Sequence, residues 1–136
     1  MKRIILAFDS FKGCASSQEI AAAARQGITD CLAGCEVVTV PVADGGEGTA
    51  EAICASLPVE RVSCRVHDPL MCPIEATYGI TADGTTAVLE MAAASGLPLV
   101  PPATWNPLLS TTWGTGAMIS DTLGGACRRL VLGVGC

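Results

Sequence analysis

The chain has 136 residues, half of them hydrophobic and only 15% charged, a composition that argues against intrinsic disorder. Eight basic against thirteen acidic residues give a net charge of −5, and nucleic acid is a poor partner because its phosphates need clustered lysine and arginine. No run of about 18 apolar residues could span a membrane, and the short run IILAF near the start is no secretory leader, so we expect a cytoplasmic location.

The first half of the chain predicts a strand, a helix, a second strand and a second helix. Residues 3–8, RIILAF, indicate a fully buried strand. Ser16 and Glu19 form the capping-box pattern at the start of the first helix. A second strand is expected over residues 36–43 and a second helix over 49–56. This order predicts a parallel strand pair with a right-handed crossover.

Two loops follow these strands, FDSFKG at residues 8–13 and ADGGEGT at residues 43–49. Neighbouring parallel strands have their carboxyl ends at one edge of the sheet, where open α/β sheets bind ligands. We therefore expect the two loops to face each other and to form the functional site.

The second half of the chain predicts a sheet with a hairpin. Strands are expected over residues 59–66 and within 67–80 and 85–91, and Ala82-Asp83-Gly84 is the tight turn of the hairpin. The remaining predicted elements are a proline-rich extended crossing at 96–107, a helix at 114–123 and a buried strand at 128–135.

The predicted fold class is α/β: a parallel sheet with flanking helices, followed by the start of a second α/β domain that contains the β-hairpin. We place these domains at residues 1–66 and 67–136. The last strand runs into Gly133-x-Gly135 with no crossover helix after it. We therefore expect the sequence to be part of a longer protein, and to be poorly soluble or oligomeric when alone.

The eight cysteines form no CxxC pair, and the single histidine, His67, is too little for a zinc-finger pattern. We interpret most of them as small buried hydrophobes in a cytosolic chain. A metal site or a disulfide framework is the less favoured alternative.

The ADGGEGT loop has the composition of an anion site at a helix start. Its glycines let backbone N–H groups approach an anion closely. Asp44 and Glu47 would repel a bare phosphate, but they fit a divalent cation or a sugar-like hydroxyl beside it. The alternative is an acidic, solvated turn.

The FDSFKG loop places an acid and a lysine side by side. Lys12 supplies a compact positive charge for phosphoryl oxygens or a carboxylate. Asp9 could accept a proton from an attacking hydroxyl or hold Mg²⁺. Alternatively, Asp9 caps the turn and pairs with Lys12.

Two further features have open interpretations. The stretch from Ser110 to Gly116 is rich in hydroxyl groups and glycine, and could bind an anion through its donors. It could equally be a helix N-cap supplied by Thr112 or Thr115. Glu90 lies in an apolar run, either on the solvent face of a strand or as a buried acid aimed at a ligand.

Five motifs occur in order along the chain: DSFKG, PVADGGEGT, EMAAASGLPLVPP, NPLLSTTWGTG and RRLVLGVG. From Met1 to Gly135 they resemble the bacterial glycerate kinase family that phosphorylates D-glycerate with ATP. The resemblance implies an N-terminal part of a much longer protein with two α/β domains around a cleft. It also implies ATP and Mg²⁺ as cofactors, and conversion of D-glycerate to 2-phosphoglycerate in organic-acid or glyoxylate catabolism. Cys14 and Cys136 depart from the pattern, where a small hydroxyl residue and a glycine are expected.

The resemblance implies roles for particular residues. Asp9 and Lys12 are the candidates for catalysis, and Asp44 and Glu47 are candidate ligands of Mg²⁺ or of glycerate hydroxyls. The candidates for substrate or phosphate contacts are Ser10, Gly13, Gly45, Gly46, Gly48, Thr49, Thr111, Thr112, Thr115 and Gly116.

Two alternatives stay open. One is a truncated, inactive relative of the kinase, and the other is a non-catalytic α/β module that binds a phosphorylated metabolite. A receiver domain with Asp9 as phosphate acceptor is disfavoured, because its lysine would follow a later strand rather than stand three residues away at Lys12.

Overall fold

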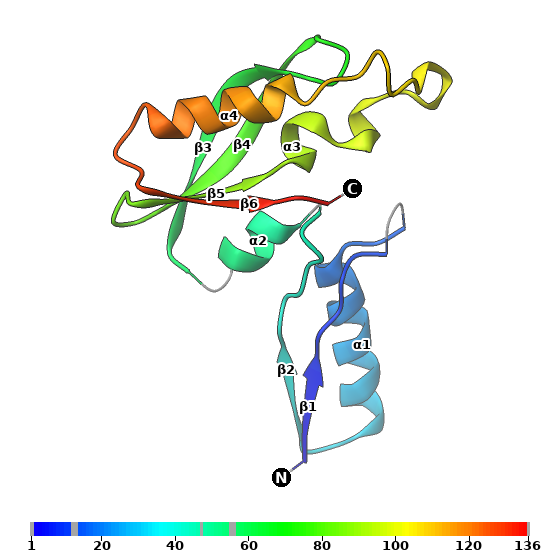
Figure 1. Cartoon of the computed structure of the whole chain (residues 1–136). Coiled ribbons are helices and arrows are strands. Elements are labelled where there is room, and N and C mark those ends of the chain that lie inside the picture. The colour runs from blue at the N-terminus through cyan, green and yellow to red at the C-terminus, as the bar shows by residue number, and fades with distance from the viewer. Residues whose placement is uncertain (1, 12–13, 47, 55–56, 136) are drawn as a thin grey trace. The chain divides into compact units, whose positions relative to one another are not determined.

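The computed structural model describes residues 2–11, 14–46, 48–54 and 57–135. The chain forms two compact units, Met1–Asp44 and Gly45–Cys136. Each unit contains a sheet of its own, with two strands in the first and four in the second (Figure 1).

The first unit is a strand–helix–strand motif made of β1 (Lys2–Leu6), α1 (Ser17–Cys31) and β2 (Cys35–Thr39). The two strands are parallel, and their register runs from Lys2↔Cys35 to Leu6↔Thr39. The predicted parallel pair is confirmed, although β2 ends earlier than the expected strand at 36–43.

The capping box at the start of α1 is confirmed. The side chain of Ser16 accepts a hydrogen bond from the Glu19 N–H at 3.3 Å, and the Ser16 N–H donates to the Glu19 carboxylate at 2.8 Å. These two contacts satisfy donors that have no partner inside the helix, so the helix start is fixed locally.

The second unit carries a mixed sheet in which the strands lie in the order β3 (Val59–His67), β4 (Pro73–Thr81), β5 (Thr86–Glu90) and β6 (Arg129–Gly133). The pairs β3–β4 and β4–β5 are antiparallel, whereas β5–β6 is parallel. The hairpin turn between β4 and β5 is confirmed, and Gly84 adopts a left-handed φ of 70° there. The helices of this unit are α2 (Thr49–Cys54), α3 (Ala92–Ser95) and α4 (Trp113–Leu123).

Helices cover both faces of this second sheet (Figure 1). On one face the Tyr78 hydroxyl donates to Asp121 of α4 at 2.7 Å. On the other face Gly79 leaves room for Cys54 of α2, whose Sγ would lie 3.3 Å from an added Cβ. Neighbouring residues in a strand point to opposite faces, so this pair marks the two layers. The core toward α3 and α4 contains Val66, Ala76, Tyr78, Ala87, Leu89, Ala94, Met118 and Cys127.

The two strands expected to be buried are largely exposed. In β1 only Leu6 is buried, and Ile5 is 62% exposed. In β6 only Gly133 is buried, while Leu130 and Val131 are exposed. Both strands lie at the edge of their sheet with one paired neighbour, so the described part of the chain covers them incompletely.

The expectation that most cysteines are buried is also wrong for the described ones. Cys127 is buried, whereas Cys14, Cys31 and Cys72 are exposed. Cys14 follows β1, Cys31 ends α1 and Cys72 lies in the turn before β4, and each of the three is exposed there. All seven described cysteines are free.

The compact units divide between Asp44 and Gly45, not after residue 66. The physical reason is β3, which pairs with β4 from Val59↔Thr81 to His67↔Pro73 and is thereby held in the second sheet. As a boundary between domains of the family, residue 66 stays a prediction.

The proline-rich stretch contains two short 3₁₀ helices, Leu97–Leu99 and Pro102–Thr104, where an extended crossing was expected. Residues 101–110 are all exposed, so the stretch does run over the surface. No helix among the described residues is long and apolar enough to cross a membrane.

Candidate functional site

The glycine loop, a name used here for the described residues Gly45, Gly46, Gly48 and Thr49, lies against the end of β6. Gly45 and Gly48 adopt left-handed φ angles of 100° and 89°, which glycine accepts without strain. A Cβ added at Gly133 would lie 2.7 Å from the Gly45 carbonyl oxygen, and one added at Gly135 would collide with the Gly46 backbone. The glycines on both sides are therefore required, because backbone packs directly on backbone.

Thr49 ends the glycine loop and begins α2. Its hydroxyl oxygen is buried and has no hydrogen-bond partner among the described residues. A buried hydroxyl without a partner carries a desolvation cost, which a bound polar ligand would relieve. Together with the buried backbone of Gly46, Thr49 makes this loop the best candidate for an anion site.

Glu90 ends β5 beside the glycine loop. It is partly buried, pairs in register with Gly133, and its carboxylate accepts a hydrogen bond from the Ala50 N–H of α2. The sequence allows Glu90 either a solvated position or a buried one directed at a ligand. In the structure its carboxylate instead bonds to the start of α2. No local sequence pattern could indicate this contact, because the two residues lie 40 positions apart.

In the FDSFKG loop, the structure describes two of the residues with predicted roles, Asp9 and Ser10. Asp9 and Ser10 follow β1 and are partly buried. The Asp9 carboxylate accepts the Ser10 N–H at 2.7 Å, as the turn-capping interpretation expects. Lys12 and Gly13 lie outside the described residues, so the pairing of Lys12 with Asp9 stays a prediction.

The segments that follow β1 and β2 leave the first sheet at one edge, because the two strands are parallel. Asp44 is exposed at the end of the segment that follows β2. Glu47 lies outside the described residues. The expected meeting of the lysine-bearing loop and the glycine loop therefore stays a prediction.

The hydroxyl-rich stretch before α4 divides into inward and outward residues. Thr115 is buried, and its hydroxyl contacts Ser95 Oγ at 2.7 Å and the Met91 carbonyl at 3.4 Å. Thr112 occupies the N-cap position but makes no side-chain cap bond. The Thr111 hydroxyl, one residue before the N-cap, accepts the Trp113 N–H at 3.2 Å. The side-chain cap expected from Thr112 or Thr115 is therefore not formed.

Glycine also has a packing role at the start of α4. A Cβ added at Gly114 would collide with the His67 carbonyl oxygen at the end of β3. Gly116, in contrast, is exposed and has open space around it. The first glycine of WGTG thus serves close helix–strand contact, and only the second faces outward.

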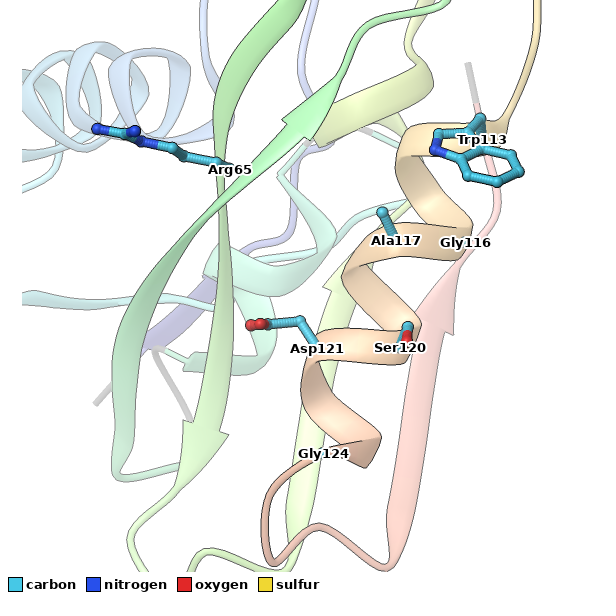
Figure 2. Close-up of a pocket in the computed structure, with 7 residues that line it drawn as sticks. All are labelled: Arg65, Trp113, Gly116, Ala117, Ser120, Asp121 and Gly124. Carbon is cyan, nitrogen blue, oxygen red and sulfur yellow. The ribbon is translucent and has the colours of Figure 1, made fainter.

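An open groove runs along α4 and includes Gly116 (Figure 2). Its walls come from α4 and from Arg65 of β3, whose side chain points away from the helix in this view. Asp121, which lines the groove, accepts a hydrogen bond from the Tyr78 hydroxyl. Among the described residues with predicted roles, Gly116 alone lines this groove, so it is a different surface from the glycine loop.

The fold and this site define a class: an α/β protein in which a glycine-rich loop packs against the carboxyl end of a parallel strand pair. The chain belongs to the glycerate kinase family, whose model matches residues 4–136. The family resemblance and the α/β fold class are both confirmed.

Individual relatives agree with this assignment. The chain is 44% identical over 133 residues to the glycerate kinase of Bacillus subtilis strain 168, and 41% identical to the glycerate 2-kinase of Escherichia coli K12. Each match covers 98% of this chain and 35% of the relative. A solved structure of a candidate glycerate kinase 2 from Salmonella typhimurium LT2 superposes with a TM-score of 0.74 at 40% identity, over 98% of this chain and 36% of that one. The chain thus spans about a third of the length of the relatives it matches.

Proposed function

We propose that this chain contributes to an ATP-dependent kinase that phosphorylates D-glycerate to 2-phosphoglycerate. The observation that carries the proposal is family membership over residues 4–136, with relatives that bear the name glycerate kinase at 39–44% identity. The glycine loop supports it, because phosphoryl transfer depends mainly on positioned donors and charge neutralisation. We also propose that the protein is cytoplasmic.

The residues of the glycine loop fit a phosphate group. Gly45 and Gly48 adopt the left-handed backbone that lets a ligand approach closely, and Thr49 offers a buried hydroxyl without a partner among the described residues. We propose that these residues hold phosphoryl oxygens of ATP or of the product. Bound ATP supplies the transferred phosphoryl group.

Asp9, Ser10, Lys12 and Gly13 are proposed to form the loop nearest the reacting group. In this proposal Lys12 neutralises charge on the phosphoryl oxygens and Asp9 receives the hydroxyl proton of glycerate.

Mg²⁺ is proposed to bind through Asp44 and Glu47. Among the described residues, no three or more Asp, Glu, His or Cys side chains gather as a metal site. Mg²⁺ in kinases commonly uses one or two carboxylates together with substrate phosphates, a mode that needs no larger cluster. Glycerate hydroxyls are the alternative partners of these two acids.

Thr111, Thr112 and Gly116 are proposed to contact substrate at the start of α4. The family resemblance also implies a substrate contact for Thr115, but its hydroxyl already bonds to Ser95 and Met91 within the unit. We therefore assign Thr115 first to the packing of α4, and its contact with substrate stays a prediction.

A chimera tests the proposal. Residues 1–136 would replace the matching third of the B. subtilis glycerate kinase, which is 44% identical there, and ADP release would be measured with and without D-glycerate. We expect glycerate-dependent ADP release. Enolase, which accepts 2-phosphoglycerate, would identify the product.

Lys12→Ala in the chimera should lower kcat by roughly 100- to 1,000-fold, as for loss of one positioned charge-stabilising group. The matched control is Lys2→Ala, at an exposed position in β1. A folded chimera that binds ATP without transferring phosphate to glycerate would favour the binding-module alternative. Undiminished turnover in Lys12→Ala would remove Lys12 from the mechanism.

A further inference from the structure

Glu90 connects two elements that are far apart in the sequence. It is the last residue of β5, and its Oε1 accepts the backbone N–H of Ala50, one residue after the glycine loop. The bond is part-buried and spans 40 positions. A contact of this kind fixes the end of the glycine loop to the sheet.

A carboxylate suits this position chemically. Ala50 lies in the first turn of α2, where N–H groups have no acceptor inside the helix. A charged acceptor makes a stronger bond to such a donor than a neutral one does. Glu90 therefore holds the first turn of α2, and with it Thr49, against the end of β5.

The same strand pair holds the other end of the loop. Gly133 and Gly135 pack on the backbone of Gly45 and Gly46 too closely to admit a Cβ. Next to Glu90, the Met91 N–H donates to the Gly133 carbonyl at 2.9 Å, which joins the ends of β5 and β6. Both ends of the glycine loop are thus fixed to β5 and β6.

We propose that Glu90 is a positioning residue that fixes the glycine loop for phosphoryl binding through its bond to the Ala50 N–H. The inference rests on the proposed function, in which this loop holds phosphoryl oxygens. Glu90 acts through Ala50 and need not touch the ligand. Loss of the bond would release one end of the loop, and a misplacement of about 1 Å costs on the order of 100-fold in rate.

The test uses three variants. Glu90→Ala removes the acceptor, and Glu90→Gln keeps a carbonyl oxygen of the same reach. Glu75→Ala is the matched control, an exposed acid in β4 of the same sheet. Amide exchange of peptides covering residues 45–54 would be measured in the 136-residue chain and in the chimera. In the chimera, kcat and KM for ATP would be measured at a temperature where every variant is folded.

For Glu90→Ala we expect faster exchange over residues 45–54 and a loss in kcat/KM on the order of 10- to 100-fold. Glu90→Gln should have nearly the exchange rate and kcat/KM of the parent. Glu75→Ala should change neither the exchange rate nor kcat/KM. A purely structural role would lower the unfolding temperature without moving kcat/KM in the folded state. That result, or a Gln variant as impaired as the Ala variant, would overturn the inference.

The failure of the proposed function is recognisable separately. A folded parent chimera without glycerate-dependent activity would contradict the kinase proposal. The exchange rates then test whether Glu90 fixes the glycine loop. Unchanged exchange in Glu90→Ala overturns this role. Faster exchange in Glu90→Ala, with slow exchange recovered in Glu90→Gln, supports it.

Discussion

At the scale of single residues, glycine decides how this protein is assembled. Gly133 and Gly135 permit contact between the end of β6 and the glycine loop, and Gly114 permits contact between α4 and β3. At each of the three, the nearest atom to an added Cβ is a backbone atom, which cannot move aside as a flexible side chain would. Each position is therefore defined by a neighbour far away in the sequence.

Gly133→Ala is predicted to destabilise the chain by about 1–3 kcal/mol, the usual cost of overpacking. The added Cβ would lie 2.7 Å from the Gly45 carbonyl oxygen and 3.3 Å from Thr49 atoms. Urea denaturation followed by circular dichroism would measure the loss.

Gly27→Ala is the matched control for this substitution. Gly27 lies inside α1 and has no atom within 4 Å of an added Cβ. Alanine there should be neutral or should stabilise the chain by up to about 1 kcal/mol, through helix propensity. Equal stability changes in the two variants would contradict the close-packing explanation.

At the scale of elements, Tyr78 links β4 to α4. Tyr78 is 5% exposed, and its hydroxyl donates to Asp121 Oδ2 at 2.7 Å. Burial, followed by the hydrogen bond and negative charge of Asp121, raises the pKa of Tyr78 above its ordinary value of 10. The folded chain therefore favours the neutral phenol.

Tyr78→Phe is predicted to cost about 1 kcal/mol at neutral pH, the net value of one hydrogen bond. Because the folded-state pKa is raised, the contribution of Tyr78 to stability is fully present below pH 10 and is lost as the pH rises above 10. The stability difference between wild type and Tyr78→Phe should therefore shrink in that range.

Tyr78 is the only tyrosine in the sequence, so absorbance at the tyrosinate band reports this residue alone. We expect ionisation at a higher pH in the folded chain than in the urea-unfolded chain. Coincident titration curves would show that the phenol is not held by Asp121.

At the scale of the whole molecule, the chain exposes many large apolar side chains. Four of them fall within residues 105–113: Trp105, Leu108, Leu109 and Trp113. Leu108 is 90% exposed and Leu109 is 71% exposed. A concentrated apolar segment of this kind commonly marks a surface that associates.

The 136-residue chain is predicted to self-associate with increasing concentration. Sedimentation velocity would measure the association, and replacing Leu108 and Leu109 together by Ser should weaken it. Leu32→Ser, at an exposed leucine after α1, is the control and should leave it unchanged. A monomer at all concentrations would contradict the prediction.

The sequence alone determined the features that depend on near neighbours. Ser16 and Glu19 predicted the capping box because three residues suffice to close it. Apolar runs and the Asp83-Gly84 turn predicted the strands and the hairpin, and successive motifs predicted the family. Lys12, Gly13 and Glu47, which carry much of the predicted chemistry, lie outside the described residues.

Only the tertiary structure decided which distant residues meet. Burial of β1 and β6 was predicted wrongly because an apolar run reports what a strand could bury, not which neighbours cover it. Thr115 turned inward, and the Glu90 bond to Ala50 has no local signal. Contacts across 20 to 40 positions are set by the packing of sheet and helices, and that packing is a property of the folded chain.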